Sequence, residues 1–228
     1  MNHELSFGGV CRRYFSHVFL CVLCCFASLA QADSYDDFIF AVKFNDVKTV
    51  QALLNKGMNA NTTEAIRGET VMMIALREKS SKVFEALLKH PDIKLEARAN
   101  NGDTALMLAS YLQNLPAVSQ LIAAGASINQ AGWTALHYAA AVGDTPIMLA
   151  LLDKTADVNA ESPNKTTPLM MAVRSGNTVA VQLLLDKGAD ILRINDMGLS
   201  ALDFAIQLEK REIAEVLSIR IKQDGKQQ

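Results

Sequence analysis

The chain is poor in aromatic residues and in proline, and neither sign of charge predominates. Only 6% of its 228 residues are aromatic and 5 are proline, whereas 50% are hydrophobic. This composition excludes a disordered chain and a collagen-like one. Lysine and arginine number 22 against 24 acidic residues, a net charge of −2. That balance gives no electrostatic reason to expect nucleic acid or an anionic membrane as a partner.

Cysteine is confined to the first 25 residues, at Cys11, Cys21, Cys24 and Cys25. This segment has the three parts of a secretory signal, because Arg12 and Arg13 precede an apolar stretch, residues 18–30, and Ala-Gln-Ala ends at residue 32. The stretch is shorter than the roughly 18 apolar residues of a membrane-spanning helix. We therefore expect cleavage before Asp33 and a periplasmic or secreted mature protein without stable membrane insertion. The alternative is a buried hydrophobic N-terminal helix.

Removal of residues 1–32 changes the meaning of the cysteines. The Cys21-x-x-Cys24 spacing would belong to the leader, so it predicts neither a redox site nor a metal site in the mature chain. Lipidation is not expected, because Leu23 precedes Cys24 where a small residue is required. Loss of three charged residues leaves 20 basic and 23 acidic residues, a net charge of −3. We expect no metal and no cofactor.

Hydroxyl residues recur along the rest of the chain at intervals of 34, 30, 33 and 33 residues. They are Thr70, Thr104, Thr134, Thr167 and Ser200. A leucine follows each of them after 17 residues, at Leu87, Leu121, Leu151, Leu184 and Leu217. Five equal offsets indicate a repeated structural unit of about 33 residues.

Each repeat has the pattern of two short helices joined by a turn. The hydroxyl residue stands where a helix N-cap is expected, and Pro168 suits a first helical turn. Ala139, Ala140 and Ala172 lie where neighbouring units must approach closely, and Gly143 ends a first helix. The second helix places apolar residues at i, i+3 and i+4. Because neither helix could bury its apolar face alone, the units must stack.

This pattern resembles the ankyrin repeat. Residues 132–160, GWTALHYAAAVGDTPIMLALLDKTADVNA, contain the T-x-L-H tetrad of that family at residues 134–137. Residues 164–191, NKTTPLMMAVRSGNTVAVQLLLDKGADI, are nearly as similar, with Met170 in place of the histidine. The resemblance implies an all-α fold, an ankyrin-repeat solenoid of helix-turn-helix units linked by β-hairpin-like loops.

By this resemblance the chain divides into a signal peptide, residues 1–32, an ankyrin-repeat domain, residues 33–221, and a polar tail, residues 222–228. Six units are expected, at residues 33–66, 67–99, 100–131, 132–163, 164–195 and 196–221. The first and last units resemble caps, whose polar outer faces keep a stack soluble. We expect Phe38, Phe40 and Phe44 to form the core of the N-terminal cap.

The interval between Thr104 and Thr134 is three residues shorter than its neighbours. Since the offset to each leucine is unchanged, the deletion falls in the loop at residues 129–132, which we expect to be truncated. One interpretation is a neutral deletion in a surface loop. The other is that the shorter loop uncovers the neighbouring surface for a ligand.

Patterns for catalysis and metal binding are absent from the sequence after residue 32. It has two histidines, His90 and His137, no cysteine, and no glycine-rich phosphate loop or nucleophile-elbow motif. The resemblance makes His137 a structural hydrogen-bonding residue between units, and we expect His90 to be a solvated residue at a helix end. We therefore expect no catalytic residue and no enzymatic activity.

The resemblance implies a protein-binding surface on the concave side, formed by the loops and the first helices. The residues that it assigns to this surface form an apolar centre with charged residues around it. The centre comprises Trp133, Tyr111, Leu112 and Val142, and the surrounding residues are Asp103, Arg77 and Arg174. Aromatic anchors with a polar rim are typical of interface hot spots. The alternative is that Trp133 packs on its own loop and Tyr111 covers its helix.

Two classes of function are consistent with these features. The first is an exported, periplasmic, non-catalytic module that binds a protein as an inhibitor, an immunity factor or an accessory to an exported enzyme. The second is a secreted effector that engages host proteins.

Overall fold

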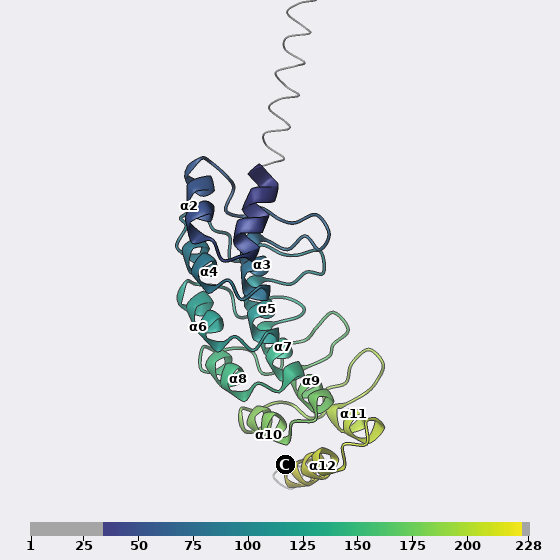
Figure 1. The fold of residues 1–228 in the computed structure, drawn as a ribbon. Coiled ribbons are helices and arrows are strands. Elements are labelled where there is room, and N and C mark those ends of the chain that lie inside the picture. The colour runs from purple at the N-terminus through teal and green to yellow at the C-terminus, as the bar shows by residue number, and fades with distance from the viewer. Residues whose placement is uncertain (1–33, 225–228) are drawn as a thin grey trace, which may run out of the picture.

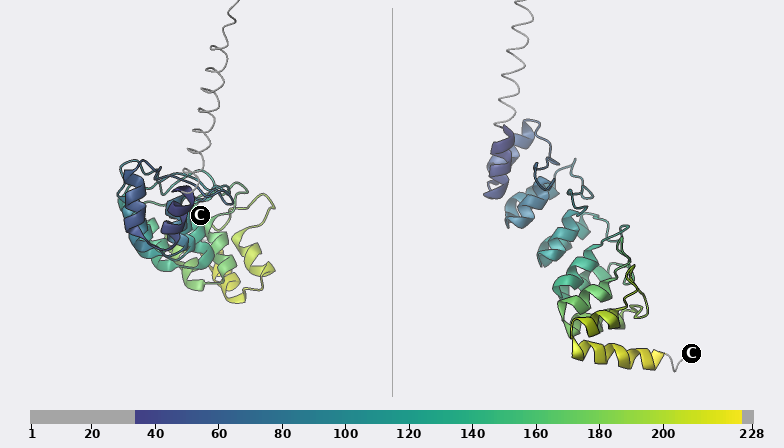
Figure 2. Two further views of the ribbon diagram at one scale, coloured as in Figure 1. Left: turned by 45° about the horizontal axis from the view of Figure 1, so that its top comes forward. Right: turned by 90° about the vertical axis from the view of Figure 1, so that its right-hand side faces the viewer.

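The computed structural model describes residues 34–224, which form two columns of antiparallel helices (Figure 1). Within this range the only β-structure is two isolated bridges, Thr63–Thr70 and Ile194–Ser200. The N-terminal and C-terminal units lie at opposite ends of the stack, and Figure 2 shows the same stack from two further sides. The predicted all-α solenoid is confirmed. The predicted signal peptide and its cleavage site lie outside the described residues.

Each unit contributes one inner helix and one outer helix. The inner helices are residues 34–43, α3 (Val71–Arg77), α5 (Ala105–Tyr111), α7 (Ala135–Val142), α9 (Pro168–Ser175) and α11 (Ala201–Gln207). The outer helices are α2 (Val47–Asn55), α4 (Ser81–Leu88), α6 (Leu115–Ala123), α8 (Thr145–Leu152), α10 (Thr178–Asp186) and α12 (Arg211–Asp224). The loops between units project on the side of the inner helices (Figure 1).

The five repeated hydroxyl residues are the N-caps of α3, α5, α7, α9 and α11. In four of these helices the hydroxyl accepts the backbone N–H three residues later, at Met73, Met107, Met170 and Asp203. Thr134 differs, because its hydroxyl lies 2.9 Å from Nδ1 of His137. Hydrogen bonds of this kind satisfy the donors that an N-terminus leaves free. The predicted capping role of the hydroxyl residues is confirmed.

The leucines at the constant offset form the seam between the two columns. Leu87, Leu121, Leu151, Leu184 and Leu217 are each 0% exposed. Ala139, Ala140 and Ala172, which were expected at close contacts between inner helices, are also fully buried. The sequence register is therefore correct along the whole stack.

Side-chain hydrogen bonds tie successive loops together on the outer side. Asn61 accepts the N–H of Lys94, Asn129 that of Asp157 and Asn159 that of Asp190, at 2.7–2.8 Å. Glu96 does the same for Ser127 at 2.7 Å. One side chain in each of four successive units thus fixes the position of the next loop, and so the spacing of the loops on the concave side.

The contact between units 2 and 3 is looser than that between units 4 and 5. Leu76 occupies the place, six residues after the N-cap, where units 3 and 4 have Ser110 and Ala140. A groove of about 470 Å³ lies between units 2 and 3. Leu76, Phe84 and Ala117 contribute to its apolar lining.

The structure corrects two expectations about the ends of the stack. Of the three phenylalanines assigned to the N-terminal core, only Phe38 is buried, while Phe40 and Phe44 are 61% and 67% exposed and stack with ring centroids 4.2 Å apart. Both lie in the first of the described units, so no described unit precedes them to cover these side chains. Helix α12 continues to Asp224, past the expected boundary at residue 221.

In the described part of the chain no helix is long and apolar enough to span a membrane.

Candidate protein-binding surface

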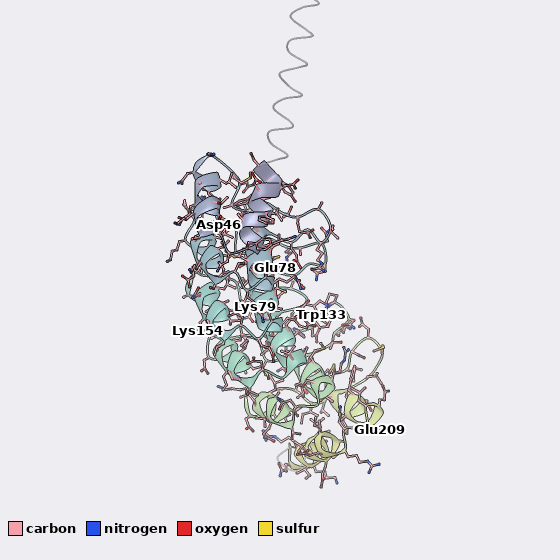
Figure 3. The ribbon with its side chains drawn as sticks, in the orientation of Figure 1. Asp46, Glu78, Lys79, Trp133, Lys154 and Glu209 are labelled. Carbon is pink, nitrogen blue, oxygen red and sulfur yellow. The ribbon has the colours of Figure 1, made fainter. Side chains whose placement is uncertain are left out.

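Three aromatic side chains from two neighbouring units meet on the concave side. The ring of Tyr138 lies 6.2 Å from that of Tyr111 and 6.4 Å from that of Trp133, in edge-on arrangements. Trp133 also packs edge-on against His137, with centroids 5.2 Å apart. Tyr111 is 52% exposed, whereas Trp133 is half-buried. Trp133 comes from the loop before α7 and faces the side of the projecting loops (Figure 3).

Asp103 joins this group through a hydrogen bond from the Tyr138 hydroxyl. The second oxygen of the carboxylate accepts from the Asn101 amide at 2.6 Å. Burial and the neighbouring Asp103 carboxylate together raise the pKa of Tyr138, so its hydroxyl stays protonated and keeps donating. The bond connects unit 3 to unit 4 and fixes the Tyr138 ring between Tyr111 and Trp133.

Arg77 lies one unit earlier and is held by Glu69, whose two oxygens accept from Nε and Nη2 of the guanidinium. The pair raises the pKa of Arg77, chiefly through the Glu69 hydrogen bonds, with smaller effects of Glu78 and Asp103. Arg77 is thus a charged side chain oriented by its neighbour rather than a free cation.

The structure does not bring all the predicted site residues into one contact. Tyr111, Trp133 and Asp103 belong to a single cluster, which we call the aromatic cluster together with Tyr138. Leu112 and Arg77 instead line the groove between units 2 and 3. Val142 is half-buried, and Arg174 is exposed with Nη1 3.8 Å from the sulfur of Met171. Among the described residues, no ring contact or hydrogen bond links either of them to the cluster.

Sequence reasoning missed Tyr138, the residue that connects the cluster. It lies four residues after the N-cap, at the position that Phe40 occupies in the first unit and Phe204 in the last. That position is one helical turn after the N-cap on the same face of the inner helix. The signal was therefore present in the repeat, but only positions before the N-cap and at the helix end had been assigned to the surface.

His137 has the structural role that the resemblance implied. Its Nδ1 accepts the Thr134 backbone N–H at 3.2 Å, so Nε2 carries the proton and donates it to the Thr166 carbonyl of the next unit at 2.9 Å. Burial lowers the pKa of His137 to about 4, against smaller opposing effects of the bond to Thr166. The neutral ring is therefore a fixed bridge between units 4 and 5.

Other histidine and acidic side chains do not gather into a site. His90 follows α4 and accepts the Asp92 N–H through Nδ1 at 3.3 Å. Between residues 34 and 224 no three histidine, cysteine or acidic side chains are close enough to hold a metal ion.

The loop at residues 129–132 lacks the hydrogen bond that closes its counterparts. The other four loops between units have a backbone bond across the turn, for example Ala99 N–H to Asp103 O and Ser162 N–H to Thr166 O, at 2.9 and 3.0 Å. No such bond spans 129–132, as the shortened interval predicts. Trp133 follows this loop directly, so the aromatic cluster lies beside the shortest loop.

Comparison with known proteins identifies the repeat. The family model described as ankyrin repeats (3 copies) matches residues 91–162 and 159–227, more than half of the chain. Mouse Rabankyrin-5 is 31% identical over 150 residues, and the human transient receptor potential cation channel subfamily A member 1 is 30% identical over 165 residues. These matches cover 63% and 66% of this chain but only 13% and 14% of those proteins.

A solved structure is similar over nearly its whole length. It comes from the complex of the predatory endopeptidase Bd0816 of Bdellovibrio bacteriovorus with the immunity protein Bd3460. The match has a TM-score of 0.68 and 26% identity, and it covers 80% of this chain and 96% of that chain. Ankyrin repeats mediate protein binding. The family model matches more than half of the chain, and the paired helices repeat with the same kind of N-cap. The chain therefore belongs to the ankyrin-repeat family.

Proposed function

We propose that this protein is an exported, non-catalytic module that binds a protein partner through the aromatic cluster on its concave side. The observation that carries the proposal is the cluster itself. Tyr111 is a large aromatic side chain that is 52% exposed, and it packs edge-on against Tyr138, which also contacts Trp133. Rigid aromatic anchors of this kind dominate interface energies, because they bury much area at little cost in side-chain entropy.

The partner class that we propose is an exported hydrolase, which the protein would inhibit, neutralise or assist in a periplasmic or secreted compartment. Two observations support this. The similar solved structure is a complex of an endopeptidase with an immunity protein. The secretory signal pattern of residues 1–32 would place the chain in the same compartment as an exported enzyme.

Affinity capture from the native envelope fraction tests the proposal. The wild-type chain and Trp133→Ala are used as baits, and each captured protein is purified, titrated against the wild type and assayed for hydrolase activity with and without it. The proposal requires a captured hydrolase that is lost with Trp133→Ala. Capture of host proteins alone, from a host-cell lysate, would favour an effector, and equal capture by both baits would contradict the concave site.

Mass spectrometry of the native protein tests export separately. Cleavage between Ala32 and Asp33 gives a mature chain without cysteine. A mature chain that retains Cys21 would contradict export.

A further inference from the structure

The aromatic cluster carries a carboxylate that has no cationic partner. Asp103 accepts hydrogen bonds from the Tyr138 hydroxyl and the Asn101 amide, both of them neutral groups. Within residues 34–224 it forms no ion pair. A half-buried carboxylate whose hydrogen-bond donors are all neutral keeps a negative charge that attracts an approaching cation.

The preceding unit contributes a second carboxylate on the inner column, that of Glu78. Arg77 interacts electrostatically with Glu69, Glu78 and Asp103. Of these three, only Glu69 forms an ion pair with it. The side chain of Glu69 is 9% exposed and that of Arg77 35%, so Glu69 is the enclosed member of the pair. Glu78, at the end of α3, is exposed on the inner column (Figure 3) and forms no ion pair in the described range. Two carboxylates of the inner column, Glu78 and Asp103, therefore form no ion pair among the described residues.

The rings themselves attract positive charge. Tyr111 and Tyr138 are nearly perpendicular, at 86°, and Trp133 and Tyr138 are inclined at 61°. Tyr111, which is 52% exposed, is the ring of the cluster most accessible to a partner. The faces of tryptophan and tyrosine rings carry partial negative charge and bind ammonium and guanidinium groups.

We propose that the aromatic cluster is the docking site for a basic side chain, a lysine or an arginine, of the protein partner. The cation would lie against the faces of Tyr111 and Trp133, with Asp103 as its counter-charge and Glu78 steering its approach. Arginine fits best, because a planar guanidinium stacks on a ring while it donates to a carboxylate. This inference rests on the proposed function and adds the chemistry of the contact: a partner whose interface presents an arginine or a lysine.

The single tryptophan of the chain makes the site directly observable, since Trp133 is its only source of indole fluorescence. The probe is hexa-arginine, titrated into the purified protein, with hexa-glutamate and hexa-serine as controls. A saturable change in Trp133 emission with hexa-arginine alone, weakened by added salt, is the expected result. No saturable change, or an equal change with hexa-glutamate, would overturn the inference.

Three variants separate the site from general attraction to a negatively charged protein. Asp103→Asn keeps an oxygen for the Tyr138 hydroxyl but removes the charge, and it is expected to weaken hexa-arginine binding roughly tenfold, the factor that about 1.4 kcal/mol produces. Tyr111→Leu removes a ring at an exposed position and is expected to act in the same direction. Glu212→Gln removes an exposed carboxylate from α12, at the far end of the stack, and should leave binding unchanged. Equal weakening by Asp103→Asn and Glu212→Gln would overturn the inference.

Failure of this inference is distinguishable from failure of the proposed function. If capture of a hydrolase depends on Trp133 but the hydrolase binds Asp103→Asn as tightly as wild type, the concave binding site is supported and the docking of a basic side chain is contradicted. If hexa-arginine binds at the cluster while no protein is captured, the preference of the site for a cation is supported and the proposed partner class is contradicted.

Discussion

The buried seam and the aromatic cluster lie in the same units but follow opposite rules. In the seam, the residue 17 positions after each N-cap is a leucine in all five repeats, and each is 0% exposed. On the concave side, the residue before each N-cap changes with every unit: Glu69, Asp103, Trp133, Thr166 and Leu199. Stacking requires the same side chain at the seam position of each unit, whereas a residue that binds a partner can differ from one unit to the next. The seam should therefore determine stability, and the cluster should determine binding.

The largest expected effect is on the seam. Leu151→Ala and Leu184→Ala should each lower the free energy of unfolding by about 2–5 kcal/mol, because both side chains are fully enclosed and leave cavities. Chemical denaturation measures the change, and coupling between neighbouring units spreads it through the stack. Leu149→Ala is the matched control, since Leu149 is on the same helix but 40% exposed. A cost for Leu151→Ala no larger than that of the control would contradict the assigned register.

Lowering the pH should reduce the free energy of unfolding of the stack, because His137 becomes protonated. Burial lowers the pKa of this residue from 6.5 to about 4, so the folded state holds the neutral ring. The stabilisation is complete above pH 6.5, is lost as the pH falls towards 4 and amounts to about 3 kcal/mol in total. Denaturation at a series of pH values measures it. His137→Met is the matched variant, because Met107 and Met170 fill the same position in units 3 and 5. An unchanged pH profile in that variant would contradict the assignment.

Trp133→Ala should affect both properties, because Trp133 is half-buried against His137 and also lies in the cluster. We expect partner binding to weaken by about 2 kcal/mol or more. Calorimetric titration against the captured partner, with denaturation of the same preparation, separates the two effects. Arg211→Ala, an exposed change at the start of α12, is the control. Lys210 is a poorer control, because its side chain covers Gly176.

The smallest expected effect concerns the turns between the helices. Gln113 has φ of +57° at the position where units 4 and 5 have Gly143 and Gly176. Because a left-handed conformation is unfavourable for residues with a side chain, Gln113→Gly should raise the free energy of unfolding by about 0.5–1 kcal/mol. The reverse change, Gly143→Ala, should destabilise, since its new Cβ would lie 2.9 Å from Asn177. Thermal denaturation of the two variants should show opposite shifts.

The fold could be predicted from the sequence because its determinants are local and repeated. A hydroxyl at each N-cap and a leucine 17 residues later fix the register without any knowledge of three-dimensional contacts. The resemblance likewise placed His137 correctly as a bridge between units.

The composition of the site could be predicted only in part, because its contacts are not local. The Tyr138 hydroxyl donates to Asp103, 35 residues earlier, and this contact joins two units at a position to which the sequence analysis gave no role. Phe40 and Phe44 were assigned to the core because they are large and apolar, yet no described unit precedes theirs to bury them, and both are exposed. The groove beside Leu76 is lined by residues of two units, so the helix pattern of a single repeat does not reveal it.

Tyr111→Ala tests the central claim most directly, because Tyr111 is the most exposed ring of the cluster and lies outside the buried seam. The measurement is its affinity for the captured partner together with its free energy of unfolding. The account predicts that binding weakens by about 2 kcal/mol, roughly thirtyfold, while stability changes by no more than about 0.5 kcal/mol. Unchanged affinity, or a loss of affinity matched by an equal loss of stability, would contradict a binding surface that is separate from the seam.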